Sequence, residues 1–163
     1  MKLLDILDAT PIPVTYRIAF LTNFFREPVL RKIDHEFGLI RPELTVLICL
    51  SYKSNLNARD ICEITEQPSN TVSRAVVSLT EKGYISRSGD QHDARRIVLA
   101  ITSEGQRLHD LAMAYFVEAE EAMLAGLSEK EIATLTALLD KLARAAPQWS
   151  AKVGLIAGDS RGK

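Results

Sequence analysis

Short polar side chains lie along one side of a predicted helix over residues 68–82. At about 100° per residue, Asn70, Arg74, Val77 and Glu81 share this side, and Ser73 and Ser78 border it. Arginine can donate two parallel hydrogen bonds to guanine or to a phosphate, asparagine can pair with adenine, and valine can touch a thymine methyl group. The chemistry available to this row is therefore the reading of base edges in a DNA groove. From these residues alone, an ordinary exposed helix face is an equally good interpretation.

Two arginines lie in a polar, glycine-containing segment over residues 88–96. If this segment joins two strands, Arg95 and Arg96 lie near the tip of a loop, where an arginine can enter a narrow, strongly negative minor groove. The charge of Asp93 does not suit DNA, but its carboxylate can hold a neighbouring arginine in a fixed orientation. The same residues also fit a polar hairpin loop with a surface ion pair.

Several stretches of the chain carry apolar residues at intervals of three or four positions, which is the spacing of amphipathic helices. They predict helices over residues 13–32, 42–52, 103–125 and 128–146. Pro28 is expected to kink or divide the first of these helices, because proline cannot donate the helical hydrogen bond.

The middle of the chain has the pattern helix, tight turn, helix, hairpin. Asn57 is a good N-cap for a short helix, and Pro68 begins a second helix that ends at Gly83 in a left-handed conformation. The inward face of the short helix is expected to contain Ala58, Ile61, Cys62 and Ile64. Residues 84–87 and 97–101 then predict two strands, whose hairpin we call the wing. The predicted fold is mainly α with a small β-hairpin wing.

The charges of this 163-residue chain are segregated, although the net charge is only −1. Residues 68–96 contain five cations against three anions. Residues 103–144 contain eight anions against four cations. A near-neutral total thus conceals a basic wing and helix on an acidic body, as expected of a protein that binds nucleic acid through one surface.

The order and spacing of several segments resemble the MarR family of bacterial repressors. The resemblance is carried by residues 58–61, 68–74, 79–85, 93–95 and 99–105, and it extends over roughly residues 12–145. It implies a repressor that binds double-stranded DNA as a homodimer, with two reading heads about one helical turn apart on a pseudo-palindromic operator. It assigns contacts with the major groove and phosphates to Ser69, Asn70, Thr71, Ser73 and Arg74. It also assigns minor-groove contact to Arg95 and the orientation of an arginine to Asp93.

We expect four segments along the chain. Residues 1–40 form an N-terminal dimerisation helix, residues 41–102 the winged helix-turn-helix domain, residues 103–146 the C-terminal dimerisation helices, and residues 147–163 a flexible tail. The outer helices have broader apolar stripes than a small winged-helix core can cover, so a second copy of the chain is the simplest partner.

The resemblance further implies that a small aromatic acid or an oxidant can release the DNA. A pocket for an aromatic effector is predicted from Tyr16, Phe24, Phe25, Arg26 and Tyr115, with Arg26 holding a carboxylate. The alternative is that these residues belong to the core and the dimer interface. Cys49 and Cys62 lie on apolar helix faces, where buried, inert thiols are expected, and the sequence leaves open whether either has a redox role.

Other classes of function lack support in the sequence. No nucleophile and base, phosphate-binding glycine loop or spaced metal-ligand cluster is recognisable, so neither an enzyme nor a cofactor is expected. No basic leader or membrane-length apolar run is present, so we expect a cytoplasmic protein. The remaining alternative is a winged-helix protein-interaction module that does not bind DNA.

Overall fold

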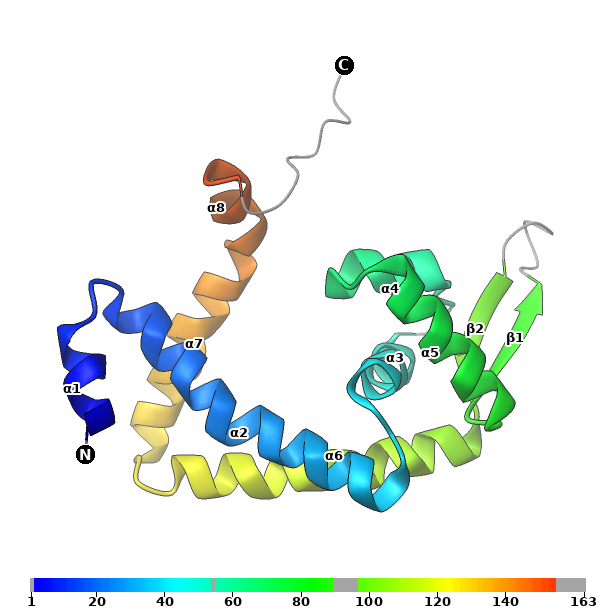
Figure 1. Ribbon diagram of the computed structural model, residues 1–163, viewed down its shortest axis with the longest axis horizontal. Coiled ribbons are helices and arrows are strands. Elements are labelled where there is room, and N and C mark those ends of the chain that lie inside the picture. Colours follow the sequence, from blue (N-terminus) through cyan, green and yellow to red (C-terminus); the bar gives the residue numbers. More distant parts are fainter. Residues whose placement is uncertain (1, 54, 90–96, 155–163) are drawn as a thin grey trace. The chain divides into compact units, whose positions relative to one another are not determined.

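The computed structural model describes residues 2–53, 55–89 and 97–154 (Figure 1). Contacts within the chain divide it into two units, residues 1–120 and residues 121–163. The first unit contains the predicted helix-turn-helix and hairpin and most of the helix that follows them, and the second contains the last two helices. The predicted mainly helical fold with a two-stranded hairpin is confirmed.

The N-terminal helices are longer and more numerous than predicted. Helix α1 (Lys2–Ala9) was not predicted, and Arg17 of the next helix holds its end by donating to the Leu7 carbonyl and to Asp8 Oδ1, both at 2.7 Å. Helix α2 (Pro13–Phe37) contains Pro28 in its interior and ends at Gly38 in a left-handed conformation. Pro28 therefore does not divide the helix.

The helix-turn-helix has the predicted elements, with ends shifted by one residue. They are α3 (Arg41–Tyr52), α4 (Ala58–Thr65) and α5 (Ser69–Glu81). Asn57 Oδ1 accepts from the Asp60 backbone N–H, and Asp60 Oδ2 accepts from the Asn57 N–H, each at 2.9 Å. This reciprocal pair satisfies two donors at the start of α4, so the predicted N-cap is confirmed.

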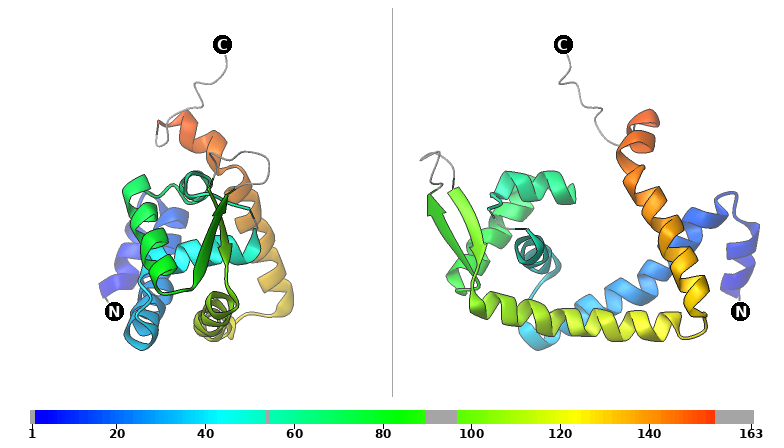
Figure 2. Two further views of the ribbon diagram at one scale, coloured as in Figure 1. Left: turned by 90° about the vertical axis from the view of Figure 1, so that its right-hand side faces the viewer. Right: turned by 180° about the vertical axis from the view of Figure 1, so that it is seen from behind.

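The wing follows α5 through Gly83, whose φ of +76° permits the tight reversal. Strands β1 (Ile85–Gly89) and β2 (Ile97–Ile101) pair antiparallel, with Ile85 opposite Ile101. Leu99 also donates its N–H to the Leu56 carbonyl at 2.8 Å, which ties β2 to the segment before α4. Figures 1 and 2 show the hairpin beside α5, directly before α6 begins.

One apolar core holds α3, α4, α5 and the hairpin together. Its buried side chains include Leu44, Leu47, Ile61, Val72, Leu79 and Leu99. The prediction that Ile64 faces inward was wrong, since it is 52% exposed. Ala58, Ile61 and Cys62 form the packed face, and Thr65 rather than Ile64 continues it one turn further on.

Helix α6 (Ser103–Leu124) leaves the hairpin and packs against α2. The rings of Phe25 and Phe116 lie 5.8 Å apart. The Tyr115 hydroxyl donates to Glu36, and Lys32 Nζ lies 3.9 Å from the centre of the Tyr115 ring. Aromatic, cation–π and hydrogen-bond contacts thus join the two helices within the first unit.

The second unit contains α7 (Glu129–Arg144) and α8 (Ala146–Lys152). The Ser128 N–H donates to Glu131 Oε2 at 2.8 Å, and Ser128 Oγ accepts from the Glu131 N–H, so these two residues form a capping box at the start of α7. A flexible tail was expected from residue 147, but residues 146–152 are helical. Trp149 Nε1 donates to the Leu142 carbonyl at 3.4 Å and links α8 to α7.

Among the described residues, no helix has the length and apolarity needed to span a membrane.

The contact of Gly105 with the hairpin gives a first prediction. A Cβ at Gly105 would lie 2.0 Å from the Tyr84 carbonyl oxygen, a backbone atom that cannot move without shifting β1. Gly105→Ala is therefore expected to lower the free energy of unfolding by about 3 kcal/mol in urea denaturation. Gly126→Ala is the control, because a Cβ there meets nothing within 4 Å. Equal stabilities of the two variants would contradict this packing.

Candidate nucleic-acid interface

Helix α5 has one buried face and one exposed face, as predicted. Val72, Ala75, Val76 and Leu79 are buried in the core. The opposite side exposes Asn70, Ser73, Arg74, Val77 and Glu81, the row predicted from the sequence. We call this exposed row the reading row. Because the buried side chains fix the rotation of the helix, the reading row must face outward.

The start of α5 presents further groups that could bind phosphate. Pro68 occupies the N-cap position, so it contributes no side-chain cap to the first turn. Ser69 is exposed and Thr71 is half-buried. A helix N-terminus with uncapped N–H groups and short hydroxyls is a favourable environment for a phosphate oxygen.

A buried carboxylate that was not predicted from the sequence holds the other end of α5. Glu43 in α3 is only 2% exposed. Its Oε1 accepts from Ser78 Oγ at 2.6 Å and from Lys82 Nζ at 2.8 Å, while its Oε2 accepts from the Ile40 N–H at 3.1 Å. The position of Glu43 at the third residue of α3, suited to a capping box, was the available sequence signal.

Burial is the largest single effect on the Glu43 carboxyl, and burial alone would raise its pKa. The hydrogen bonds from Lys82, Ser78 and Ile40, together with the charge of Lys82, outweigh burial and hold the pKa of Glu43 below its ordinary value. Glu43 is therefore a carboxylate at neutral pH.

The structure describes the base of the wing. Arg87 is exposed on β1 opposite Leu99. The predicted minor-groove residues Arg95 and Arg96, and the orienting residue Asp93, lie outside the described residues. The strands on either side run to Gly89 and Ile97, so the base of the hairpin is fixed beside α5.

A cavity of about 330 Å³ lies between the start of α3 and α5. It is lined by Ile40, Pro42, Glu43, Thr71, Arg74, Ala75 and Ser78. The cavity therefore reaches the reading row through Arg74 and the buried carboxylate through Glu43. None of the residues predicted to bind an aromatic effector lines it.

The predicted effector-pocket residues lie on α2 and α6. They are Tyr16, Phe24, Phe25, Arg26 and Tyr115. Phe24 is 66% exposed and its ring lies 4.7 Å from Phe20 on the same helix, whereas Phe25 packs against Phe116. The Tyr115 hydroxyl donates to Glu36, and Lys32 Nζ lies over the Tyr115 ring. The ring contacts of Phe24, Phe25 and Tyr115 thus point to different neighbours.

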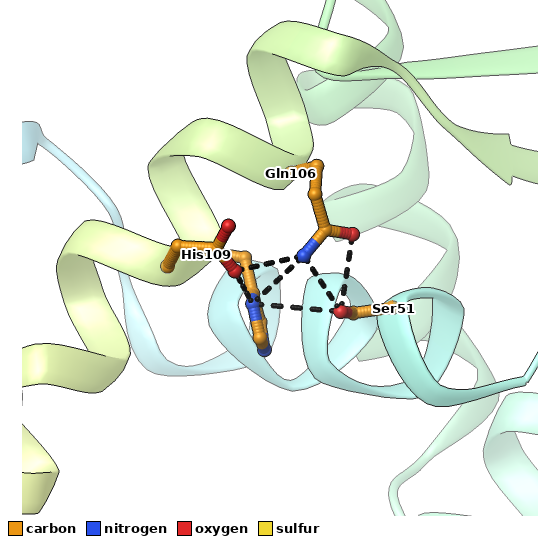
Figure 3. Close-up of polar contacts among 4 residues, drawn as sticks. Ser51, Gln106 and His109 are labelled. Carbon is orange, nitrogen blue, oxygen red and sulfur yellow. Dashed lines mark hydrogen bonds and ion pairs between the residues drawn. The ribbon is translucent and has the colours of Figure 1, made fainter.

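A polar network joins α3 to α6 behind the helix-turn-helix (Figure 3). Gln106 Nε2 donates to Ser51 Oγ at 3.0 Å and to Asp110 Oδ1 at 2.8 Å. His109 Nδ1 lies 2.9 Å from the same Asp110 oxygen. The hydrogen bonds from His109 and Gln106 lower the pKa of Asp110. His109 is a buried structural group.

The two cysteines are free and half-buried. Burial raises the pKa of the Cys49 thiol, which favours the unreactive protonated form. Among the described residues, no cluster of three or more histidine, cysteine or acidic side chains could hold a metal ion.

A helix with a short polar outward row, placed beside a β-hairpin behind a helix-turn-helix, defines the winged helix-turn-helix class of DNA-binding proteins. Residues 37–96 match the family model described as MarR family. The chain belongs to the MarR family of transcriptional regulators, which is a family of regulators and not of enzymes.

Individual relatives agree with this assignment. The chain is 30% identical to a MarR/EmrR family transcriptional regulator from Acinetobacter sp. ADP1, with a TM-score of 0.69, covering 83% of this chain and 95% of that chain. It is 26% identical to the HTH-type transcriptional regulator BilQ of Clostridium symbiosum (strain WAL-14163), covering 77% of this chain and 90% of that protein. A MepR variant from S. aureus bound to an oligodeoxyribonucleotide has a similar fold, with a TM-score of 0.57 and 22% identity over 81% of this chain and 96% of that chain.

The Glu43 contacts predict an acid-dependent contribution to stability. Because the folded-state pKa of Glu43 lies below the ordinary value of 4.5, the carboxylate stabilises the fold fully above about pH 4.5, and this stabilisation is lost as pH falls through the lower folded value. Glu43→Gln is expected to lower the free energy of unfolding by about 2 kcal/mol at neutral pH. In urea titrations, the difference from wild type should narrow below about pH 4.5. A difference that stays constant down to about pH 3 would contradict the assignment.

Proposed function

We propose that this chain is a transcriptional repressor that binds a pseudo-palindromic operator as a homodimer. Helix α5 would enter the major groove and the wing the adjacent minor groove. The observation that carries the proposal is the reading row, in which mostly short or forked polar side chains are exposed directly opposite the buried face of α5. A mixed row of long charged side chains would be more typical of an ordinary solvated helix face.

The proposed contacts follow the positions of the side chains. Ser69, Asn70, Thr71, Ser73, Arg74 and Val77 would contact bases and phosphates in the major groove. Arg95 and Arg96 would contact the minor groove, with Asp93 orienting one of them. The similar fold of the DNA-bound MepR variant supports a nucleic-acid partner over a protein partner for this surface.

The proposed homodimer would cover apolar side chains that stay exposed in the second unit. Leu135, Leu138, Leu139 and Leu142 lie on one side of α7 and are each 39–58% exposed. An apolar row of this length is typical of a protein interface. A second copy, bound mainly through residues 1–40 and 103–146, would present two reading heads to the two half-sites.

We further propose a cytoplasmic location and release of the DNA by a small aromatic acid. Arg26 supports the effector, because its Nε is buried with no hydrogen-bond partner among the described residues, although Glu27 Oε1 lies 3.4 Å away. A ligand carboxylate would bind Arg26, and the rings of Tyr16, Phe24, Phe25 and Tyr115 would have to turn from their present neighbours to pack on the ring of the ligand. A release screen with phenolic acids on the preformed protein–DNA complex tests this part.

The DNA-binding surface is tested on a duplex selected from genomic fragments by the purified wild-type protein. Arg74→Ala and Arg95→Ala are each expected to weaken binding about tenfold or more, because each removes a charged group from the interface. The slope of log affinity against log salt should fall by about one for each phosphate that the variant no longer binds. Measurements by fluorescence anisotropy at several salt concentrations give both quantities.

Arg144→Ala is the matched control, since it removes the same charge from an exposed ion pair with Asp140 in the second unit. It is expected to leave affinity and salt slope unchanged. Wild-type affinity in both test variants, or no binding of the wild type to any duplex in dilute buffer, would refute DNA reading by this surface. The second result would favour the protein-interaction module.

The homodimer is tested with a charge on the apolar row of α7. Leu138→Glu is expected to convert dimer into monomer and to weaken binding to the full operator by at least about tenfold, because the two heads no longer bind as one unit. Ala137→Glu, exposed on the other side of α7, is the control and should remain dimeric. Analytical ultracentrifugation measures the state of association. A wild-type protein that is monomeric at micromolar concentration would contradict the proposal.

A further inference from the structure

We infer that Glu43 is a positioning residue for DNA recognition and that Lys82, although it is a cation beside the reading row, does not contact phosphate. The buried carboxylate takes up the charge of Lys82, and the two residues with Ser78 fix the position of α5 against α3. We call these three residues the α5 clamp. This inference rests on the proposed function, because it concerns how the reading row is presented to DNA.

Both carboxylate oxygens of the clamp are hydrogen-bonded. Glu43 Oε1 accepts hydrogen bonds from Ser78 Oγ at 2.6 Å and from Lys82 Nζ at 2.8 Å. Glu43 Oε2 accepts a hydrogen bond from the Ile40 N–H at 3.1 Å. Lys82 Nζ also donates to the Gly38 carbonyl at 3.2 Å. The last turn of α5 is thus bonded to the end of α2 and to the start of α3.

The clamp lies at the edge of the apolar contact between α3 and α5. A surface pocket of about 330 Å³ opens there, lined by Ile40 and Pro42 on one side and by Thr71, Arg74 and Ala75 on the other. Beside this pocket, directional hydrogen bonds from Glu43 join the two helices in addition to their apolar core contacts. Apolar contacts tolerate small rotations, whereas hydrogen bonds weaken steeply when their angles change.

The location of the clamp makes rotation of α5 important. Ser78 and Lys82 are four residues apart and lie together on the flank of the helix, about 100° from the centre of the reading row. A rotation of about 20° about the helix axis would displace a side-chain tip roughly 5–6 Å from the axis by about 2 Å. That displacement breaks hydrogen bonds to base edges but leaves looser contacts with phosphates largely intact.

The clamp also changes the count of charges available to DNA. Lys82 counted among the five cations of residues 68–96 in the sequence. The positive charge of Lys82 is neutralised by its ion pair with Glu43, whose side chain alone is 3% exposed. Arg74, in contrast, forms no ion pair among the described residues, so it remains able to bind a phosphate or a base.

The experiment compares Glu43→Gln, Lys82→Met and the double variant on the selected duplex and on a scrambled duplex. Each substitution at the clamp is expected to weaken binding to the selected duplex about tenfold, similar to the removal of one base contact, and binding to the scrambled duplex less than about twofold. The double variant should be no weaker than the weaker single variant, because both remove one interaction. Lys82→Met should keep the wild-type salt slope, whereas Arg74→Ala lowers it by about one.

Glu131→Gln is the matched control, since Glu131 is also the acidic residue of a capping box but lies in the second unit. It should leave both affinities unchanged. If Glu43→Gln does not fold, Ser78→Ala can replace it, because it removes one donor of the clamp. This variant should bind the selected duplex about threefold more weakly and change the affinity for the scrambled duplex by less than about twofold.

Two results would overturn the inference while the proposed function stands. One is a salt slope reduced by about one in Lys82→Met, which would make Lys82 a phosphate contact. The other is unchanged selectivity between the two duplexes in the folded clamp variants. A wild-type protein that binds no duplex would instead overturn the proposed function, and the inference with it.

Discussion

The burial of one side of α5 is the constraint on which the rest of the reading surface depends. Val72, Ala75, Val76 and Leu79 are removed from water against α3 and α4, and each large apolar side chain contributes roughly 1.5–3 kcal/mol by this burial. Burial of these positions fixes the rotation of α5 about its axis, so the residues on the opposite side of the helix face outward. The hairpin shares the same core through Ile85 and Leu99, so the helix and the base of the wing are held by one set of contacts.

Buried polar groups add directional hydrogen bonds to the apolar contacts of this core. Helix α3 makes hydrogen bonds of this kind at both of its ends. Glu43 near its start binds α5, and Ser51 near its end binds Gln106 of α6 (Figure 3). Such networks are not an efficient source of stability, because desolvating a charge offsets much of the attraction. Their effect is to favour one geometry among several with similar apolar burial. A protein that must match the spacing of base edges benefits from that selectivity more than from additional stability.

The sequence was informative wherever one local rule acted alone. Periodicity predicted the two faces of α5, and the caps at Asn57 and Ser128 and the turn at Gly83 follow from backbone chemistry within a few residues. The sequence was uninformative where the position of a side chain depends on segments that are distant in the chain. The exposure of Ile64 depends on which side of the short α4 meets α5, and the importance of Glu43 depends on Ser78 and Lys82, which lie more than thirty residues away in the chain. No local pattern contains that pairing, although the position of Glu43 in α3 suggested a cap.

The charge distribution has a consequence for how the proposed complex must achieve its affinity. With Lys82 neutralised by Glu43, the cations of the described α5 and β1 segments that form no ion pair there are Arg74 and Arg87. So few free cations within α5 and β1 would release few counterions, and the proposed contacts of Arg95 and Arg96 in the wing would supply the rest of the electrostatic attraction. Base contacts and the simultaneous binding of two heads would add to this attraction. Both contributions lead back to the rigid presentation of α5, because two heads can bind together only if each holds its reading row in the same register on the duplex.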